Sequence, residues 1–450
     1  MERQMLRASL EKLKQNGNLL TCDVEVDPEY ELGAVLKYYS NTRPMLFSKV
    51  KGYRIPVVGA MFGDRNIYYN MLNLTHGDRI YRIIDAIANP KPTRLLNTGP
   101  VKENIITRNI DIPRMFPIPT FHEKDSSSYI TAGIIVIKDP ETNKRYTSVR
   151  RLQVNGGNRL SILVASPKLK DQLLNLENQN KPLEVAIILG YDYEFLLASQ
   201  VSSHFFGVDK YEIDSALRGE PLELVKCHTV DLEVPAYAEI VLEGIIPPKK
   251  REIEGPFGEL MGYYGGANSH PIIEITAVMH RNNPIFQVSF PCREEHLPNG
   301  LIREVELYTS LSKLVDVKDV NVTIGGGYRF HAVVSINKKK EGDAKSAILA
   351  ALGCNNDFKH VIVVDDDVDI FNTSEVEGIL ATRVQASKDL VIISGANGSV
   401  LDPSHNYKGT TDKIGIDATK PLEKKGVDFE KAKIPRYENI EITKYFPNIK

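Results

Sequence analysis

The sequence predicts an α+β fold with a β-rich middle, and three observations support this fold class. Short helical and extended patterns alternate over residues 1–105, where a proline-rich connector ends the first part. Extended runs dominate residues 106–300, and strand and helix patterns alternate again over 318–450. Between the last two parts, apolar residues recur every three or four positions, which predicts a linker helix over 301–317. We therefore expect an α/β domain on each side of a central β domain.

The first predicted element is an amphipathic helix near the amino terminus. Its apolar residues Met5, Leu6, Leu10 and Leu13 share one helical face, and Gly17 ends the pattern. Charged residues run through the whole segment, so it lacks the apolar centre of a secretion signal. We expect no export signal here.

The central domain begins with extended runs that are typical of an antiparallel meander. These runs are YITAGIIVIK from Tyr129, RYTSVRRLQV from Arg145 and RLSILVA from Arg159. A helical stretch over 167–218 follows, and further strands continue to about residue 295. They are LELVKC, YAEIVLEGII, PIIEITAVMH and PIFQVSF. A barrel or a curled sheet suits this succession of strands.

The last domain alternates strands with helices, as a layered α/β domain requires. The predicted strands are YRFHAVVSIN, HVIVVDDDVDIF and DLVIIS. The predicted helices are DAKSAILAALGC and SEVEGILATRV.

Composition restricts the classes of function. The chain has 450 residues, of which 42% are hydrophobic and 25% charged, as in an ordinary soluble globular protein. Its 56 Lys and Arg against 58 Asp and Glu give a net charge of -2, without the basic excess of a nucleic-acid-binding protein. Cys22, Cys227, Cys292 and Cys354 are far apart, which argues against a disulfide framework or a cysteine zinc site. This cysteine usage fits a reducing cytosol, so we expect a cytoplasmic protein. No apolar run approaches the roughly 20 residues that cross a bilayer, so we expect no membrane span.

Two carboxylates occupy a loop rich in glycine and proline, EGPFGELMGYYGG, which begins at Glu254. Glu254 and Glu259 are five residues apart, and such a loop can direct both into one cavity. Burial raises the pKa of a carboxyl group and a nearby arginine lowers it, so one glutamate can stay ionised while the other holds a proton. The alternative is a surface loop whose acids are solvated.

Three cations form the second candidate group. Arg150 and Arg151 fall on opposite faces of the predicted strand, so one of them must point inward or into a cleft, where it needs an anion. Lys413 lies in a segment with glycines and could meet a phosphate. The alternative is that these side chains extend into solvent.

Three other patterns do not indicate sites. The acidic run Asp365–Asp369 has Ile370 where a calcium loop needs glycine. Gly325–Gly327 lacks the spacing of a dinucleotide-binding fingerprint and precedes a strand. The ten histidines include no HExxH pattern, so we expect no histidine metal site.

Beyond these motifs, stretches along nearly the whole chain closely resemble the UbiD family of decarboxylases, which use prenylated FMN. They are YITAGIIVIKDPETNKR, SVRRLQV, ALRGEPLELVKC, VPAYAEIVLEG, EGPFGELMGYYGG, VIVVDDDVDIF, ATRVQ and TDKIGIDATKP. The resemblance implies an amino-terminal α/β domain, a central split β-barrel that binds the flavin, and a carboxy-terminal α/β domain for oligomer contacts. It also implies a carboxy-lyase that reversibly decarboxylates an aromatic or α,β-unsaturated carboxylic acid.

By position, the resemblance implies a Glu-Arg-Glu triad. Arg151 and Glu254 match the family's ion pair beside the flavin, and Glu259 matches the glutamate that delivers the proton replacing carbon dioxide. The other residues expected at the cofactor are Ser148, Gln153 and, at its phosphate, Lys413. Since Ser148 and Arg151 fall on opposite faces of a regular strand, both can reach one site only if a bulge or sharp twist intervenes.

The chain departs from the family at its metal site. Related enzymes bind a divalent cation with an Asn, a His and a Glu, and these positions carry Tyr146, Leu169 and Lys210 here. None is a usual ligand of Mg²⁺ or Mn²⁺, so a divalent metal is doubtful and no metal residues are expected. The Lys210 ammonium and the Tyr146 hydroxyl are expected to meet the cofactor phosphate instead. Asp209 and Glu212 are close enough to take the place of Lys210 as a metal ligand if the backbone shifts.

The expected partners follow from this resemblance. They are a small carboxylic-acid substrate, carbon dioxide, a flavin prenyltransferase as cofactor supplier, and further copies of the chain in a homodimer or larger homo-oligomer; nucleic acid and membranes are not expected. Two alternatives are a non-catalytic, accessory subunit of a carboxylase complex and a homologue that binds FMN or another phosphorylated ligand. Retention of Arg151, Glu254, Glu259 and Lys413 favours the enzyme, because unpaired buried charges destabilise a fold.

Overall fold

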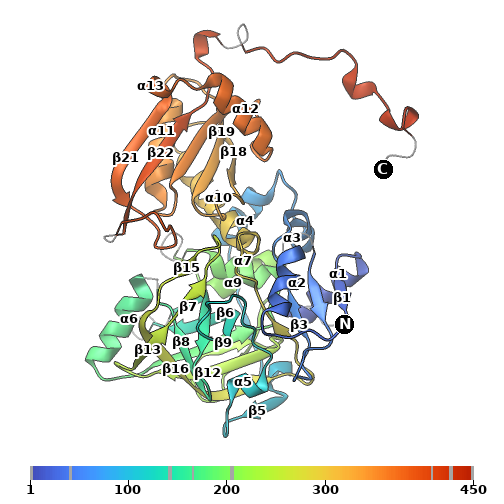
Figure 1. Ribbon diagram of the computed structural model, residues 1–450, viewed down its shortest axis with the longest axis vertical. Coiled ribbons are helices and arrows are strands. Elements are labelled where there is room, and N and C mark those ends of the chain that lie inside the picture. The colour runs from blue at the N-terminus through green and yellow to red at the C-terminus, as the bar shows by residue number, and fades with distance from the viewer. Residues whose placement is uncertain are drawn as a thin grey trace.

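The computed structural model describes residues 4–39, 43–139, 144–164, 167–202, 207–406, 409–424 and 429–446. Each of the three parts of the chain is built around a β-sheet (Figure 1). The carboxy-terminal sheet and its helices lie at one end, the central barrel lies at the other end, and the amino-terminal part packs beside the barrel. This arrangement confirms the predicted fold class, whereas the domain limits at 105, 300 and 317 stay predictions.

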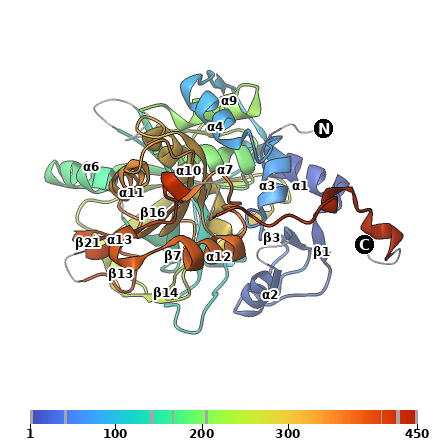
Figure 2. The same cartoon turned by 90° about the horizontal axis from the view of Figure 1, so that it is seen from above.

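The amino-terminal part is built on a sheet with the strand order β1-β2-β3-β17. Its elements are α1 (Met5–Gln15), β1 (Leu20–Cys22), α2 (Glu31–Tyr39), β2 (Met45–Phe47), β3 (Val57–Gly59), α3 (Arg65–Leu72) and α4 (Arg79–Ala88). The predicted first helix is confirmed, since α1 buries Met5, Leu6, Leu10 and Leu13 and ends shortly before Gly17. Viewed from above, α1 and α2 lie on the side of the molecule opposite α6 (Pro167–Asn178) (Figure 2).

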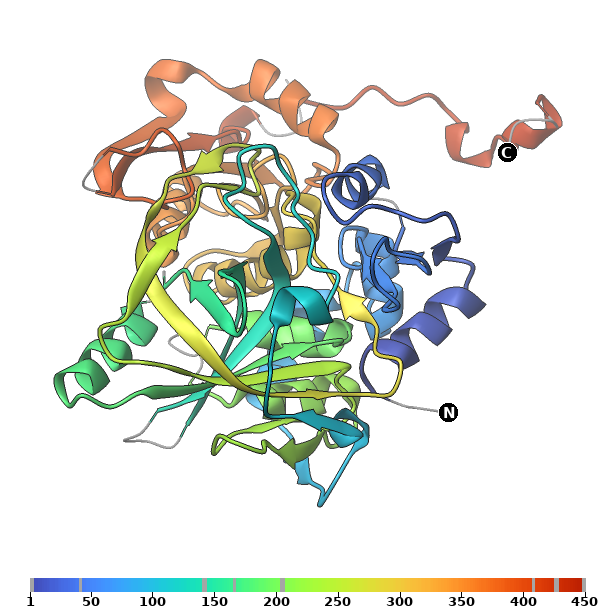
Figure 3. The ribbon, with the colours of Figure 1, turned by 60° about the horizontal axis from the view of Figure 1, so that its bottom comes forward.

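The central part contains a closed antiparallel barrel (Figure 3). Its strands are β6 (Tyr129–Lys138), β7 (Arg145–Val154), β8 (Arg159–Ile162), β9 (Leu183–Leu189), β12 (Ile240–Ile246) and β16 (Asn268–His280). They follow the order β12-β9-β6-β7-β8-β16, and β12 also pairs with β16, which closes the barrel. Apolar and β-branched residues dominate these strands because much of β6 and β12 is buried on both faces.

Shorter elements flank the barrel. They are β4 (Arg94–Leu95), η1 (Pro100–Lys102), β5 (Asn104–Ile106), α5 (Ile112–Met115), α7 (Tyr193–Gln200), α9 (Lys210–Arg218), β10 (Glu223–Lys226), β11 (Glu233–Pro235), β13 (Arg251–Glu254), β14 (Phe257–Gly258), β15 (Tyr264–Gly265) and β17 (Phe286–Gln287). The helices α7 and α9 pack against each other and against β7, so they cover the strand that carries the predicted site residues.

Two central segments differ from the sequence-based expectation. The stretch predicted as helical over 167–218 contains β9, which lies between β12 and β6 in the barrel. A short apolar run is compatible with a buried strand or a buried helix, so periodicity alone cannot separate them. The run PIFQVSF forms β17, which pairs with β3 in the amino-terminal sheet instead of extending the barrel.

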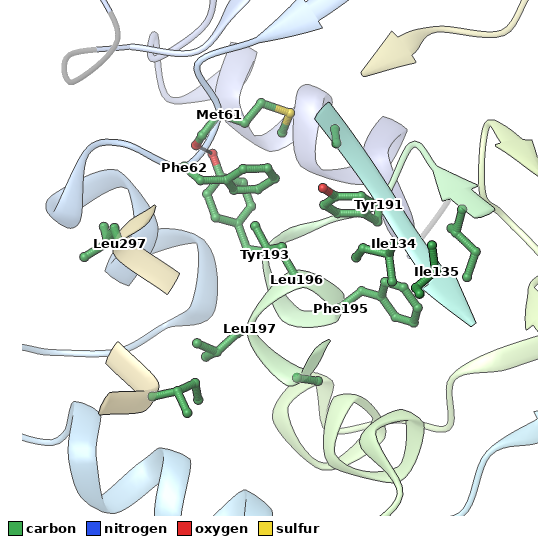
Figure 4. Close-up of a cluster of buried hydrophobic side chains, with 14 of the residues drawn as sticks. Met61, Phe62, Ile134, Ile135, Tyr191, Tyr193, Phe195, Leu196, Leu197 and Leu297 are labelled. Carbon is green, nitrogen blue, oxygen red and sulfur yellow. Dashed lines mark hydrogen bonds between the residues drawn. The ribbon is translucent and has the colours of Figure 1, made fainter. Parts of the chain in front are cut away.

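A buried aromatic cluster connects the barrel to its neighbours (Figure 4). Tyr193 at the start of α7 packs edge-on against Phe62, with ring centroids 5.2 Å apart. Its hydroxyl donates a hydrogen bond of 2.7 Å to the Met61 carbonyl oxygen. Ile134 of β6 and Leu297 of α10 (Leu297–Leu311) are buried in the same core. Close packing at this junction fixes the barrel, α7 and α10 relative to one another.

The carboxy-terminal sheet has the strand order β18-β19-β20-β22-β21. The elements after α10 are β18 (Val317–Val322), β19 (His331–Ile336), α11 (Asp343–Cys354), β20 (His360–Asp365), α12 (Thr373–Arg383), α13 (Ala386–Asp389), β21 (Leu390–Asn397) and β22 (Thr410–Asp417). The linker helix predicted over 301–317 is α10, which begins and ends earlier. Pro298 fits its first turn, where an N–H is not needed, and Val317 already begins β18. No described helix is long and apolar enough to span a membrane.

Candidate active site

A loop and a short hairpin carry the two glutamates that the sequence singled out. Glu254 ends β13, and Glu259 begins the turn between β14 and β15. Gly255 follows Glu254 with a φ of +89°, and a Cβ at this position would lie 2.6 Å from the Gly266 carbonyl oxygen. Only glycine tolerates this approach and this conformation, so it allows the chain to turn sharply after Glu254. The Glu259 N–H then donates to the Tyr263 carbonyl oxygen at 2.8 Å, which closes the hairpin turn.

Arg151 on β7 contacts both glutamates. Its Nε donates to Glu254 Oε1 at 2.9 Å and its Nη2 donates to Glu254 Oε2 at 3.0 Å, which makes a bidentate pair. Its Nη1 donates to Glu259 Oε1. The guanidinium carbon also lies 5.0 Å from the centroid of the Phe257 ring. The structure thus brings the three residues of the expected triad into one hydrogen-bonded group.

Burial determines the charge states in this group. The Glu254 side chain is fully buried, and the Glu259 side chain is 18% exposed. Burial raises the pKa of the Glu259 carboxyl above its usual value, although Arg151 acts in the opposite direction. Burial also opposes the charge on Arg151, but the carboxylates of Glu259 and Glu254 outweigh it and raise the arginine pKa. A carboxyl group with a raised pKa is suited to give a proton to a bound molecule.

Gln153 connects β7 to the loop after Glu254. Its Oε1 accepts hydrogen bonds from the Gly255 N–H and from the Tyr129 hydroxyl, both at 2.8 Å. Its Nε2 donates to the Ile253 carbonyl oxygen at 3.2 Å. The sequence predicted a cofactor contact for Gln153. That contact stays a prediction, and the contacts in the structure give this side chain a positioning role.

Two further groups beside the triad were not predicted. Asp125 accepts hydrogen bonds from the Gly258 N–H at 2.8 Å and from the His122 N–H at 3.0 Å, so it connects the hairpin to the preceding loop. His270 Nε2 lies 3.9 Å from Glu254 Oε2, while burial lowers the pKa of this histidine. Asp125 and Gly258 are 133 positions apart in the sequence, so no local pattern marks their contact.

Gly265 allows a close approach of the Glu259 carboxyl group to the hairpin. A Cβ at this position would lie 3.0 Å from Glu259 Oε1 and 3.7 Å from Arg151 Nη1. Real Cβ contacts are rarely so short, so a side chain here would displace the Glu259 carboxyl group. The missing side chain therefore lets the Glu259 carboxyl group lie against the hairpin and beside Arg151.

A second buried group of charges lies within electrostatic reach of the triad. Arg303 and Arg329 both donate to Asp357 Oδ2, Arg329 at 2.7 Å. Burial and these two arginines lower the pKa of His296 to about 3. Arg329 also acts to lower the pKa of Glu259. A polar cavity of about 230 Å³ borders Arg303 and Asp357. Sequence reasoning did not identify this group.

The predicted residues Tyr146 and Lys210 lie together, on β7 and at the first position of α9. The Lys210 ammonium donates to the carbonyl oxygens of Thr147 and Ser199, both at 2.7 Å. Its nitrogen is 5.4 Å from the centroid of the Tyr146 ring. Ser148 shares a face of β7 with Tyr146, because alternate residues of a strand point to the same side.

The irregularity expected between Ser148 and Arg151 falls on the neighbouring strand. The β6–β7 register shifts between Ile130 and Gly133, directly opposite Arg151. A bulge at this place increases the local twist of the strands. Among the described residues, no hydrogen bond joins Ser148 to the triad, so their shared site stays a prediction.

Lys413 and Leu169 lie on β22 and α6, which carry none of the triad residues. Lys413 on β22 is buried, and its ammonium donates to the carbonyl oxygens of Leu352 and Asn356, at 3.3 and 3.2 Å. These carbonyls lie at and just beyond the end of α11, and the predicted phosphate contact is untested. Leu169 on α6 is fully buried in the hydrophobic core.

The donor atoms at the family's metal position do not fit a divalent cation. Tyr146 offers a hydroxyl that already accepts a hydrogen bond from Arg150, Leu169 offers no donor atom, and Lys210 offers a positive charge. Asp209, considered as an alternative ligand, accepts hydrogen bonds from Arg145 at 3.0 and 2.7 Å. The described ranges contain no group of three or more His, Cys, Asp or Glu side chains arranged to hold a metal ion.

Family models match almost the entire chain. They are described as the 3-octaprenyl-4-hydroxybenzoate carboxy-lyase N-terminal domain (residues 10–87), Rift-related domain (94–294) and C-terminal domain (296–418).

Solved structures share the fold over nearly their full length. The UbiD-class enzyme HmfF from Pelotomaculum thermopropionicum, in complex with FMN, has a TM-score of 0.95 and 45% identity, covering 98% of this chain and 99% of that chain. An evolved dimeric form of HmfF, in complex with prFMN, has a TM-score of 0.91 and 43% identity, covering 98% of this chain and 100% of that chain.

Several curated relatives are named decarboxylases. The anhydromevalonate phosphate decarboxylase of Methanosarcina mazei is 36% identical over 427 residues, which cover 94% of this chain and 98% of the relative. The phenolic acid decarboxylase of Sedimentibacter hydroxybenzoicus is 34% identical over 444 residues, which cover 93% of this chain and 92% of the relative.

Proposed function

The chain belongs to the UbiD family of decarboxylases, and we propose that it reversibly decarboxylates an aromatic or α,β-unsaturated carboxylic acid with prenylated FMN. Similar proteins in complex with FMN and prFMN support the flavin. Relatives named as decarboxylases of phenolic acids and of anhydromevalonate phosphate support the reaction type.

One observation carries the proposal: Arg151 bridges a fully buried Glu254 and a Glu259 whose pKa is raised by burial. The three side chains come from a barrel strand and from a glycine-rich hairpin more than 100 positions away. Buried charges in such a group are costly unless they are paired, and they are paired here. This arrangement supports a site that holds an anion and also supplies a proton.

Each residue of the triad has a distinct proposed role. Prenylated FMN, when bound, would accept the electrons that remain on the substrate as carbon dioxide leaves. Arg151 orients the substrate carboxylate, and Glu254 holds the guanidinium in place through the bidentate pair. Glu259 then donates its proton to the carbon that lost carbon dioxide, and it takes a proton from this carbon in the reverse direction.

The residues around the triad suit a phosphorylated flavin. Gly265 lets the Glu259 carboxyl group lie beside Arg151, and the cations Lys210 and Lys413 are candidates for the flavin phosphate. Ser148 and Tyr146 remain the proposed neighbours of the cofactor. Because the metal donors are replaced, we derive no step that needs a divalent cation.

The proposed roles are tested by replacing Glu259. The Glu259→Gln variant should retain the flavin, measured by its absorption, while carbon dioxide release falls by about a hundredfold or more. The assay uses a panel with vanillic acid, 3,4-dihydroxybenzoic acid and α,β-unsaturated acids. Glu252→Gln is the matched control, because Glu252 lies on β13 and pairs with the partly exposed Arg159.

Two results would contradict the proposal. Normal turnover by Glu259→Gln would remove the proton-donor role. A flavin-loaded wild-type protein without activity on every acid of the panel would favour an accessory subunit of a carboxylase complex. The proposal includes assembly into a homo-oligomer and supply of the cofactor by a flavin prenyltransferase.

A further inference from the structure

We infer that the loop between β18 and β19 completes the proposed active site, with Gly327 as a positioning residue for the hairpin that carries Glu259. The hairpin consists of β14, β15 and the turn between them. Gly327 belongs to the glycine run Gly325–Gly327, to which the proposed function assigns no role. The inference rests on the proposed function, because it concerns the position of the proposed proton donor.

The turn of the hairpin contacts Gly327. A Cβ on this glycine would lie 2.6 Å from Leu260 Cδ1 and 2.6 Å from Met261 Sδ. Real Cβ atoms essentially never come within 3.0 Å of such atoms, so the two side chains fill the place that a side chain at Gly327 would need. Gly327 also has a φ of +64°, a conformation that residues with a Cβ rarely adopt. Two separate features therefore require glycine at this contact.

A displacement of Leu260 or Met261 would move Glu259, because both follow it directly in the chain. The Glu259 N–H donates to the Tyr263 carbonyl oxygen, and the Gly262 N–H donates to the Glu259 carbonyl oxygen, both at 2.8 Å. These hydrogen bonds make the turn move as one piece. Leu260 is only 5% exposed, and a side chain in a close-packed interior cannot swing aside without displacing its neighbours.

The loop on the other side of the contact is held in place. The Gly327 N–H donates to the Ile324 carbonyl oxygen at 2.9 Å, and the Tyr328 N–H donates to the Thr323 carbonyl oxygen at 3.0 Å. The Tyr328 ring packs against α10, where a Cβ on Gly300 would lie 2.7 Å from Tyr328 Cδ1. A loop held by these contacts can fix the position of the hairpin.

The same loop acts on Glu259 in a second way. Arg329 lies two residues after Gly327, and its positive charge acts to lower the pKa of the Glu259 carboxyl. From the barrel side, Arg151 donates a hydrogen bond to the same carboxyl group. The barrel and the carboxy-terminal domain therefore both determine where this glutamate lies and how readily it gives up its proton.

The experiment replaces Gly327 in the full chain loaded with flavin. In Gly327→Ala we expect kcat to fall by at least about tenfold, while KM and flavin affinity change by less than about threefold, because Glu259 moves and the other contacts remain. Hydrogen–deuterium exchange, read by mass spectrometry, reports the hairpin without any need for activity. The peptide that covers residues 257–265 should exchange faster in Gly327→Ala than in the wild type.

Gly395→Ala is the matched control for backbone strain. Gly395 lies in the same domain with a φ of +66°, and a Cβ there meets no atom within 4 Å. This variant should keep the kcat and the hairpin exchange of the wild type.

The hairpin side of the contact gives a second test. If Gly327→Ala fails to fold, Leu260→Ala removes the contact from the hairpin, and it should also lower kcat and speed exchange of the hairpin. In a Leu260→Ala/Met261→Ala background the clash is absent, so adding Gly327→Ala should lower kcat by less than about twofold further.

The outcomes separate this inference from the proposed function. Equal kcat and equal hairpin exchange in Gly327→Ala and Gly395→Ala would overturn the inference while the decarboxylase proposal stands. A full loss of kcat on adding Gly327→Ala to Leu260→Ala/Met261→Ala would also overturn it. If the wild type decarboxylates no acid of the panel, the proposed function fails and exchange alone decides the inference. Faster hairpin exchange in Gly327→Ala than in Gly395→Ala then supports it, and equal exchange overturns it.

Discussion

Arg151 and Glu254 form a bidentate ion pair between two strands of the barrel region, with N–O distances of 2.9 and 3.0 Å. Glu254 is fully buried, and His270, whose pKa is lowered by burial, has its Nε2 3.9 Å from Glu254 Oε2. Arg151 is the cation that forms the bidentate pair with this buried carboxylate. The bidentate pair fixes the orientation of the Arg151 guanidinium. Because Nη1 of the same guanidinium donates to Glu259, the pair also orients the Glu259 carboxyl group.

Replacing Arg151 should destabilise the fold as well as stop catalysis. Arg151→Met leaves the Glu254 carboxylate buried without its partner, which typically costs about 3–5 kcal/mol. Urea unfolding measures this loss. The double variant Arg151→Met/Glu254→Gln should recover part of the stability and none of the activity. A single variant as stable as the wild type would show that the pair contributes no stability.

The absence of a side chain at Gly265 should be needed for turnover. In Gly265→Ala the new methyl group would lie 3.0 Å from Glu259 Oε1 and push the carboxyl group aside. We expect activity to fall by about tenfold to a hundredfold while thermal stability changes little. Gly266→Ala is the matched control, since a Cβ there meets no atom within 4 Å. Equal activity of the two variants would contradict the assigned position of the glutamate.

Removing Arg329 should shift the alkaline limit of activity that Glu259 sets. Its charge lowers the pKa of Glu259, so Arg329→Gln should raise that pKa further. A proton donor with a higher pKa stays protonated to higher pH, and the alkaline limb of the pH–rate profile should move to higher pH. Arg159→Gln, which removes a more distant exposed charge, should leave the limb in place. A limb that moves to lower pH in Arg329→Gln would rule out Glu259 as the acid that controls it.

Glu295 should make the protein less stable at alkaline pH. Burial raises its pKa from 4.5 to about 8, so between these values the folded protein binds a proton that the unfolded chain has lost. Stability from this group is complete below about pH 4.5 and is lost as pH rises towards 8. Glu295→Gln should gain stability over the wild type in this range, by at most about 1.4 kcal/mol per pH unit. Urea unfolding at several pH values measures the difference, and a constant difference would exclude the raised pKa.

Strong local patterns made part of the fold predictable. The runs from Tyr129 and Arg145 form β6 and β7 with the expected limits, because β-branched residues and flanking turns leave little ambiguity. The strand β9 was missed because its short apolar run lies between helices. The position of β17 depends on pairing with β3, a contact between distant segments that no local pattern records.

Some residues of the candidate site could likewise be predicted from the sequence, and others could not. Glu254 and Glu259 could be singled out because a glycine- and proline-rich loop is unsuited to a helix and can turn both carboxylates inward. The role of Gln153 in positioning could not be predicted, since its partner Gly255 is 102 positions away. The electrostatic effect of Arg329 on Glu259 likewise arises only when the barrel and the carboxy-terminal domain come together.

The central claim is that this chain binds prenylated FMN beside the Arg151–Glu254–Glu259 group. Native mass spectrometry of the protein co-expressed with a flavin prenyltransferase tests it most directly. The account predicts one added mass equal to prenylated FMN per chain, together with the absorption of the modified flavin. A chain that carries no ligand, or a ligand of a different mass, would contradict it.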